Sequence, residues 1–280
     1  MPRLFCFGLG YSARALARIL EPKGWTVSGT SRDPHDAGLV RFDRDHRLST
    51  GALKGVTHLL SSIPPDATGD PAIGGARAAM LAGHATLVWV GYLSTTGVYG
   101  NTDGAWVDET TPLAPSSDRA RRRAAAEAAW FALLRDHGLP VHAFRLAGIY
   151  GPGRSVLDDV RAGTARRIAK PGHLFGRIHV DDIAATLAAS IAKPDPGAIY
   201  NVCDDEPAAP ADVVEFACGL LGVAPPPAIP FDQAELSEMG ASFWADNRRV
   251  SNAKIKRELG VRLAYPTYRE GLRAILAGGG

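Results

Sequence analysis

Short apolar runs alternate with alanine-rich stretches through the first half of this chain, and this alternation constrains the fold more than any other feature. Leu4–Phe7 predicts a buried strand, and Tyr11–Leu20 predicts a helix that ends before Pro22. The pattern continues with strands at 25–29, 40–42, 57–63, 86–93 and 141–146 and helices at 72–82 and 119–137. Strands that alternate with crossover helices predict an α/β fold, a Rossmann-type doubly wound parallel sheet.

The rhythm of the sequence changes after Gly151, where prolines gather around 194–196 and 225–230. We therefore predict a first domain over residues 1–148 and a smaller C-terminal lobe that makes up most of residues 149–280. Strand-like Ile199–Val202 is expected to return to the edge of the first sheet. The 280 residues lie near the upper size for a single hydrophobic core, ~250–300 residues.

Composition and charge exclude several other classes of protein. Apolar residues make up 46% of the chain and charged residues 21%, which is ordinary for a globular protein and excludes a wholly disordered one. The net charge of +2 argues against nucleic acid as the main partner. The three cysteines and eight scattered histidines predict neither disulfides nor a metal site. Without a signal-peptide pattern or a membrane-length apolar run, we expect a cytoplasmic protein with no membrane partner.

A glycine motif, Gly8-x-Gly10-x-x-Ala13, stands between the first predicted strand and helix. In a dinucleotide site, Gly8 would form the tight turn, Gly10 would let the backbone approach a pyrophosphate, and Ala13 would allow close packing of helix on strand. The first N–H groups of the helix, at Tyr11 and Ser12, favour an anion. The motif therefore predicts a dinucleotide site, and a purely structural turn is the alternative.

The residues after the second strand bear on which dinucleotide is bound. No acidic residue stands at positions 28–32, where NAD sites usually have one to accept from the ribose 2′-hydroxyl, whereas Ser31 and Arg32 suit a 2′-phosphate. We therefore expect NADP to be preferred over NAD. Ser61 and Ser62, at the end of the fourth predicted strand, are expected on the same sheet edge as the cofactor, although they can also serve simply as a turn before two prolines.

Further short motifs follow one another along nearly the whole chain. They are Ser94–Gly100 (STTGVYG), Glu109-x-x-Pro112-x-x-Pro115, Tyr150–Gly153 (YGPG), His179–Ile183 (HVDDI), Tyr200–Val202 and Glu206-Pro207. In order and spacing, these motifs and the glycine motif resemble the extended short-chain dehydrogenase/reductase superfamily, the NAD(P)-dependent epimerase/dehydratase group. The resemblance implies a cofactor domain, a substrate lobe and a cleft between them. It also implies a homodimer paired through the helices near 72–82 and 119–137.

The catalytic pattern of that superfamily, a Ser or Thr with a Tyr and a Lys four residues later, is incomplete here. Thr95 matches the Ser or Thr by its place before Val-Tyr-Gly. Aligned on Pro115 and the helix that follows, the Tyr and Lys positions hold Arg119 and Arg123, and none of the seven tyrosines has a lysine four residues later. Arginine stays protonated, with a pKa above ~12, so Arg119 is a poor acid or base. Arg123 can still hold the nicotinamide ribose or a phosphate.

Tyr150 is the candidate to replace the missing tyrosine. Arg154, four residues on, could lower its pKa by electrostatic attraction; alternatively Tyr150 packs against Pro152 with its hydroxyl in water. Because hydride transfer needs a nicotinamide and a placed acceptor, it survives loss of the tyrosine better than proton transfer does. We therefore predict an NAD(P)-binding oxidoreductase or isomerase of a small molecule, without the usual tyrosine. A catalytically silent NADP(H)-binding sensor or partner-binding protein is the alternative.

Overall fold

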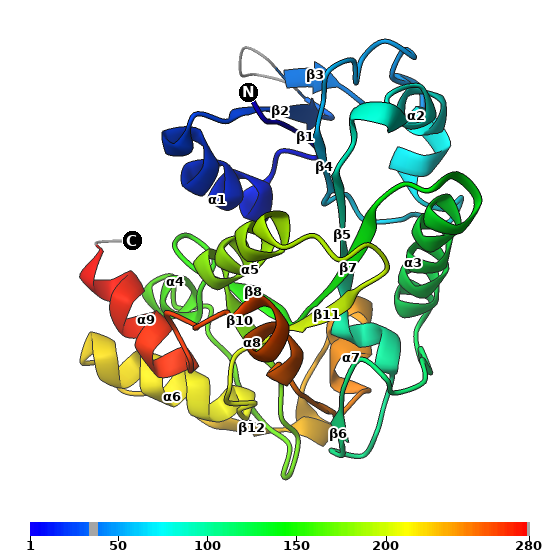
Figure 1. Cartoon of the computed structure of the whole chain (residues 1–280). Helices are drawn as coiled ribbons and strands as arrows, with labels where there is room; N and C mark the ends of the chain where they lie inside the picture. Colours follow the sequence, from blue (N-terminus) through cyan, green and yellow to red (C-terminus); the bar gives the residue numbers. More distant parts are fainter. Residues whose placement is uncertain (34–38, 279–280) are drawn as a thin grey trace.

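The computed structural model describes residues 1–33 and 39–278, and a seven-stranded parallel sheet forms its centre (Figure 1). The strands are β1 (Arg3–Phe7), β2 (Thr26–Ser31), β3 (Leu39–Arg41), β4 (His58–Ser61), β5 (Trp89–Thr95), β7 (Val141–Leu146) and β11 (Ile199–Val202). They lie in the order β11-β7-β5-β4-β1-β2-β3, and every neighbouring pair is parallel. The predicted doubly wound α/β sheet is confirmed.

Helices cover both faces of this sheet, because its strands are apolar on both sides. Successive residues of β1 alternate between two hydrophobic clusters: Leu4 and Cys6 lie in one, Phe5 and Phe7 in the other. On the first face α1 (Tyr11–Leu20) packs against α5 (Val180–Ala192), and on the second lie α2 (Pro71–Ala82) and α3 (Asp118–His137) (Figure 1). Both layers bury nonpolar surface against the same sheet.

Residues after 148 form a lobe below the sheet and also contribute to the sheet itself. The lobe contains β8 (Gly148–Tyr150), α4 (Val156–Arg161), β9 (Arg167–Ala169), β10 (Arg177–His179), α6 (Pro210–Leu221), β12 (Ala228–Pro230), α7 (Glu238–Trp244), α8 (Ala253–Leu259) and α9 (Tyr268–Ala277). A third hydrophobic cluster joins α4, α6 and α9. Strand β11 pairs with β7 and α5 packs on α1, so elements from both sides of the predicted 148/149 boundary build the central layers.

Three short parallel strand pairs tie the lobe and its loops together. Strand β10 pairs with β8, and β12 pairs with β9. Strand β13 (Arg249–Val250) pairs with β6 (Trp106–Val107), which lies in the long loop before α3. This last pair draws the segment after α7 beside the carboxyl edge of the sheet.

The cap residues of α3 fix how this helix presents its arginines. The Ser117 side chain accepts a hydrogen bond from the Ala120 N–H at 3.2 Å, and Gly138, at φ 69°, ends the helix in a left-handed conformation. Because residues four apart share one side of a helix, Arg119 and Arg123 start from neighbouring turns on the same side of α3.

A buried ion pair connects α3 to the sheet. Arg145 of β7 and Glu127 of α3 are each 3% exposed, and Arg145 Nη2 lies 2.5 Å from Glu127 Oε1. Ser94 of β5 donates to the other Glu127 oxygen at 2.7 Å, and Arg145 Nη1 donates to the Tyr99 hydroxyl at 2.8 Å. The Tyr99 hydroxyl in turn donates to Asn201 Oδ1 of β11 at 2.8 Å. This network fixes the carboxyl ends of three strands relative to α3.

Within the described residues, no helix has the length and hydrophobicity needed to cross a lipid bilayer. The same residues contain no cluster of three or more His, Cys, Asp or Glu side chains arranged to hold a metal ion.

Candidate functional site

A cavity of about 610 Å³ lies at the carboxyl edge of the sheet, between the sheet and the lobe. The residues after β1 and β4, the ends of β5 and β7, and the first turns of α3 line one part of it, and residues 174–177 and the segment from α7 to β13 line the rest. The chain reverses its direction of winding between the neighbouring strands β1 and β4. Ligands of doubly wound sheets bind in the crevice outside the strand ends at such a switch point.

The two glycines of the loop after β1 have different roles. Gly8 adopts φ +80°, and a Cβ there would lie 2.7 Å from Ile63 Cγ2, so the fold itself requires glycine. Gly10 has an extended backbone, and a Cβ there would meet no atom of the described residues within 4 Å. Ala13, in the first turn of α1, is fully buried. The space in front of Gly10 belongs to the cavity, which Gly10, Tyr11 and Ser12 all line.

The N-terminus of α1 is open toward the cavity. Among the residues that the structure describes, no side chain caps Gly10, and the first turn contains no acidic residue, so its N–H groups remain available to an anion. The Tyr11 hydroxyl donates to the Pro152 carbonyl oxygen at 3.0 Å, and the Arg154 guanidinium lies 5.9 Å from the centre of the Tyr11 ring. A Cβ on Gly151 would collide with the Tyr11 hydroxyl. These contacts hold Arg154 beside the open helix end.

Of the four residues predicted to contact the cofactor at the ends of β2 and β4, one lines the cavity and three do not. Ser62 lines the cavity, and its hydroxyl donates to a carbonyl oxygen of the glycine loop at 2.6 Å. Ser31 and Arg32, at the end of β2, do not line it; the Ser31 hydroxyl bonds to the backbone of Asp33. Ser61 does not line it either, and its buried hydroxyl has no hydrogen-bond partner among the described residues. Their roles as cofactor contacts stay predictions.

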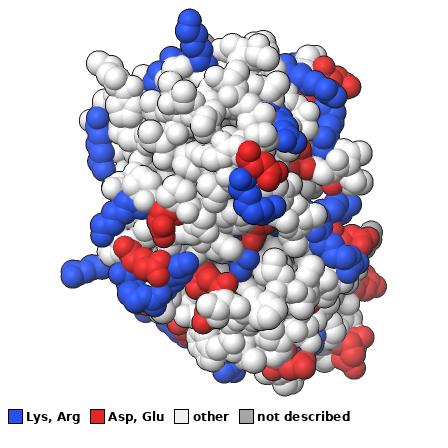
Figure 2. Space-filling view, turned by 45° about the vertical axis from the view of Figure 1, so that its right-hand side comes forward, with Lys and Arg blue, Asp and Glu red and all other residues white. Residues whose placement is uncertain are grey.

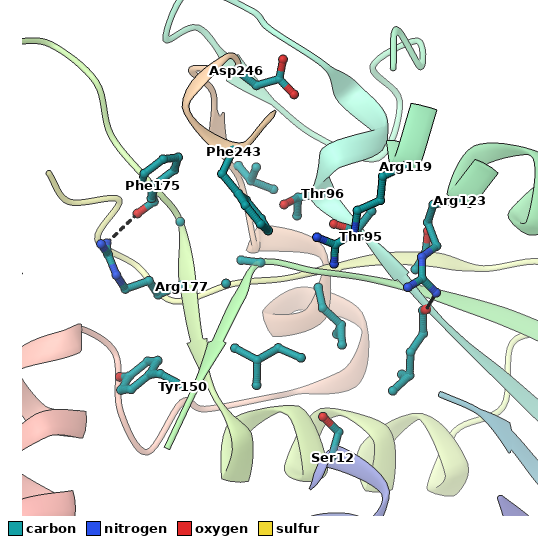
Figure 3. A pocket seen from close by; sticks show the side chains of 18 of the residues that line it. Ser12, Thr95, Thr96, Arg119, Arg123, Tyr150, Phe175, Arg177, Phe243 and Asp246 are labelled. Carbon is teal, nitrogen blue, oxygen red and sulfur yellow. Dashed lines mark hydrogen bonds between the residues drawn. The ribbon is translucent and has the colours of Figure 1, made fainter. Parts of the chain in front are cut away.

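Both arginines of α3 that the alignment singled out line the cavity. Arg123 Nη1 donates to the Leu93 carbonyl oxygen at 2.9 Å and more weakly to the Tyr92 hydroxyl at 3.3 Å. The Arg119 guanidinium lies 5.2 Å from the centre of the Phe243 ring. Figure 3 shows the two side chains diverging, with Arg119 directed toward Phe243 and Arg123 toward β5.

The two predicted catalytic residues lie in different surroundings. Thr95 ends β5, lines the cavity near Arg119, and its hydroxyl oxygen accepts from the Gly97 N–H at 3.1 Å (Figure 3). The Tyr150 hydroxyl lies against Gly271 of α9 and donates to the Thr267 carbonyl oxygen at 3.4 Å. Burial raises the pKa of Tyr150, and nearby carboxylates raise it further. A proton-transfer role for Tyr150 stays a prediction that this geometry does not support.

The charge of the cavity is strongly one-sided. Its lining contains five arginines, Arg119, Arg123, Arg154, Arg177 and Arg248, and one acidic residue, Asp246. Desolvation lowers the pKa of Arg119, and repulsion from Arg123 and Arg154 lowers it further. On the molecular face seen in Figure 2, basic and acidic side chains are intermixed. A concave site of one sign focuses the electrostatic field and attracts ions of the opposite charge.

Several lining residues were not identified from the sequence. Phe175, Arg177, Phe243, Asp246 and Arg248 come from parts of the lobe without a recognisable motif. The last three reach the cavity because β13 pairs with β6, which lies 142 or more positions earlier in the chain. A two-residue strand pair of this kind has no periodic signal in the sequence.

The fold and the cavity define a Rossmann-type α/β protein with a site at the carboxyl edge of its sheet. The model of the NAD dependent epimerase/dehydratase family matches residues 8–203, which is most of the chain. The protein belongs to this family. The resemblance derived from the sequence is thereby confirmed.

Relatives of the chain include proteins with and without a stated activity. A functionally unknown conserved protein from Silicibacter pomeroyi DSS has 50% sequence identity and a TM-score of 0.91, with 100% of this chain and 99% of that chain covered. Protein YeeZ of Escherichia coli K12 is 28% identical over 290 residues, which cover 95% of this chain and 97% of YeeZ. A 3-diazoavenalumate denitrifying reductase of a Streptomyces species is 28% identical over 138 residues, which cover 46% of this chain and 44% of the reductase.

Proposed function

We propose that the protein binds NAD(P)(H) in this cavity and acts as an oxidoreductase or isomerase on a small molecule. The observation that carries the proposal is the open space in front of Gly10, which continues to Thr95 and the lobe within one cavity. The family description and the reductase named among the relatives support it. A catalytically silent binding protein would share the cofactor site but show no turnover.

The residues present fit a dinucleotide. The uncapped N-terminus of α1 and Arg154 would hold the pyrophosphate, because backbone N–H groups and a guanidinium both bind phosphate oxygens. Arg123, anchored on the Leu93 carbonyl, would hold the nicotinamide ribose. The nicotinamide, when bound, supplies hydride transfer. The residues of the lobe would close the site over the substrate.

We also propose that the reaction does not use a tyrosine as its acid or base. The two tyrosines that line the cavity, Tyr11 and Tyr150, direct their hydroxyls to the carbonyl oxygens of Pro152 and Thr267. Arg119, which the alignment puts at the tyrosine position, stays cationic near neutral pH. Such a site can stabilise negative charge on a bound molecule, whereas it lacks a tyrosine hydroxyl placed to exchange a proton.

Two further proposals concern the whole molecule, and the first of them rests on the family resemblance. One is a homodimer paired through α2 and α3. The other is a cytoplasmic location with a small molecule as the partner.

Replacing Arg123 tests the cofactor site. We expect Arg123→Ala to bind NADPH roughly ten- to hundredfold more weakly, because one hydrogen bond to a charged group contributes ~1.5–3 kcal/mol. Arg121→Ala is the matched control: Arg121 is exposed on the same helix and pairs with Asp118. The measurement is a fluorescence titration with NADPH and NADH, with thermal unfolding of each variant. If the unmodified protein binds neither nucleotide, the proposed function is rejected.

Arg32 tests the choice between the two nucleotides. We expect NADPH to bind more tightly than NADH and Arg32→Ala to remove most of the difference, because a guanidinium at the end of β2 would bind the 2′-phosphate. The expected shift is about ten- to hundredfold, from ~1.5–3 kcal/mol for one such contact. Parallel calorimetric titrations measure both affinities. Equal affinities in the unmodified protein would contradict the preference for NADP.

A further inference from the structure

Arg119 is the side chain of the cavity whose chemistry the cofactor site leaves unused. Its contact with the Phe243 ring is cation–π in type, and it forms no hydrogen bond or ion pair with any described residue. Arginine carries five N–H donors in a planar fork that matches a carboxylate. The side chain is exposed to the solvent of the cavity, so this fork is open to a ligand.

The position of Arg119 separates it from the groups that would bind the cofactor phosphates. Arg154 and the N-terminus of α1 lie together, joined through Tyr11. Figure 3 shows Ser12, in the first turn of α1, on the opposite side of the cavity from Phe243 and Arg119. An anion bound by Arg119 would therefore lie on the lobe side, next to Thr95 and away from the pyrophosphate.

The acidic residue of the cavity does not neutralise Arg119. Asp246 accepts from Arg248 Nη1 at 2.9 Å through one carboxylate oxygen and from the Ser116 hydroxyl at 2.6 Å through the other. Arg248 Nη1 also donates to the Gly100 carbonyl oxygen at 3.0 Å. Asp246 and Arg248 thus satisfy each other and leave the positive charge of Arg119 without a counterion from the lining.

The size of the cavity limits what can bind there. Its volume of about 610 Å³ is in the range of sites that hold one drug-sized molecule. The nicotinamide half of the cofactor would occupy the part that runs from Gly10 to Arg123, so the lobe side has room for a compact molecule rather than a second nucleotide. Phe243, which is 50% exposed, presents an aromatic ring to that space.

We propose that the lobe side of the cavity binds a small organic carboxylate, held by the guanidinium of Arg119 with its apolar part against Phe243. This inference rests on the proposed function for the place of the substrate beside the cofactor. The like charges of Arg123 and Arg154 make the surroundings of Arg119 more positive, which favours an anion, and the two parallel N–H groups of its guanidinium match the two oxygens of a carboxylate.

Binding of simple carboxylates tests this inference. Benzoate, cinnamate and pyruvate are titrated calorimetrically into the NADPH-saturated protein and into the protein alone, with benzamide as the neutral counterpart of benzoate. We expect at least one carboxylate to bind in the millimolar range or better, and benzamide to bind at least tenfold more weakly than benzoate if benzoate is that ligand. Arg119→Gln should weaken carboxylate binding about ten- to hundredfold, whereas Arg121→Gln should leave it unchanged.

Other results would overturn the inference. They are the absence of binding by all three carboxylates, equal binding by Arg119→Gln, or stronger binding of phenyl phosphate or of a nucleoside diphosphate sugar than of any carboxylate. The NADPH titration separates this inference from the proposed function. Carboxylate binding that needs Arg119 in a protein that does not bind NADPH would leave the anion site in place and reject the oxidoreductase. NADPH binding without carboxylate binding would reject the anion site at Arg119 and leave the proposed function in place.

Discussion

Gly10→Val is expected to abolish dinucleotide binding while the protein stays folded. Gly10 has φ −95° and ψ −157°, an extended conformation that valine adopts readily, and its added side chain would meet no protein atom within 4 Å of the Cβ. The branched side chain would instead fill the space through which a pyrophosphate approaches the backbone. We expect no saturable binding of NADPH by fluorescence titration, with the far-ultraviolet circular dichroism spectrum unchanged.

Gly8→Ala is the control that separates the two glycines. Gly8 has φ +80°, and its Cβ would lie 2.7 Å from Ile63 Cγ2 and 3.0 Å from the Ser62 hydroxyl oxygen. We expect this variant to lose stability by roughly 1–3 kcal/mol, the cost of a strained left-handed residue. Normal NADPH binding by folded Gly10→Val would show that the glycine loop is a turn and that the dinucleotide, if bound, lies elsewhere.

The elements predicted most accurately from the sequence are those whose bounds depend on local residues rather than on distant contacts. The bounds predicted for α1, β7 and β11 agree with the structure. Helix α1 has a periodic apolar face, and each of the two strands is a mostly apolar segment with glycine, proline or aspartate close to its ends. The glycine loop was equally readable, since its strand–turn–helix context is local. The open space at Gly10 was implied by the motif and then found in the structure.

The parts that could not be predicted depend on contacts between distant segments. Phe243 meets Arg119 across more than 120 positions of the chain, and its helix is brought there by the short pairing of β13 with β6. Similarly, the spacing of Tyr150 and Arg154 suggested a mutual contact, but Arg154 packs against Tyr11 instead. Four-residue spacing brings side chains together on a helix, whereas these residues span the end of β8 and the loop after it.

Glu127→Ala is expected to cause the largest loss of stability among the variants considered. It leaves Arg145, which is 3% exposed, as an uncompensated charge between β7 and α3. Removing one partner of a buried pair costs about 3–5 kcal/mol, a large part of the ~5–15 kcal/mol that stabilises a typical domain. The Ser94 hydroxyl would also lose its acceptor. Urea unfolding followed by circular dichroism measures the change.

The control for this prediction is the pair of Arg269 and Glu206 on the surface, where both side chains are about one-third exposed. Exposed pairs contribute about 0–1 kcal/mol, so Glu206→Ala should change the free energy of unfolding by no more than that. The double variant Glu127→Leu with Arg145→Met should recover part of the loss, because it removes the isolated charge and keeps the volume. If Glu127→Ala changes the free energy of unfolding by less than ~1 kcal/mol, as expected for an exposed ion pair, water reaches Arg145. In that case the network could not be what holds the ends of β5 and β7, and therefore Thr95, in place at the cavity.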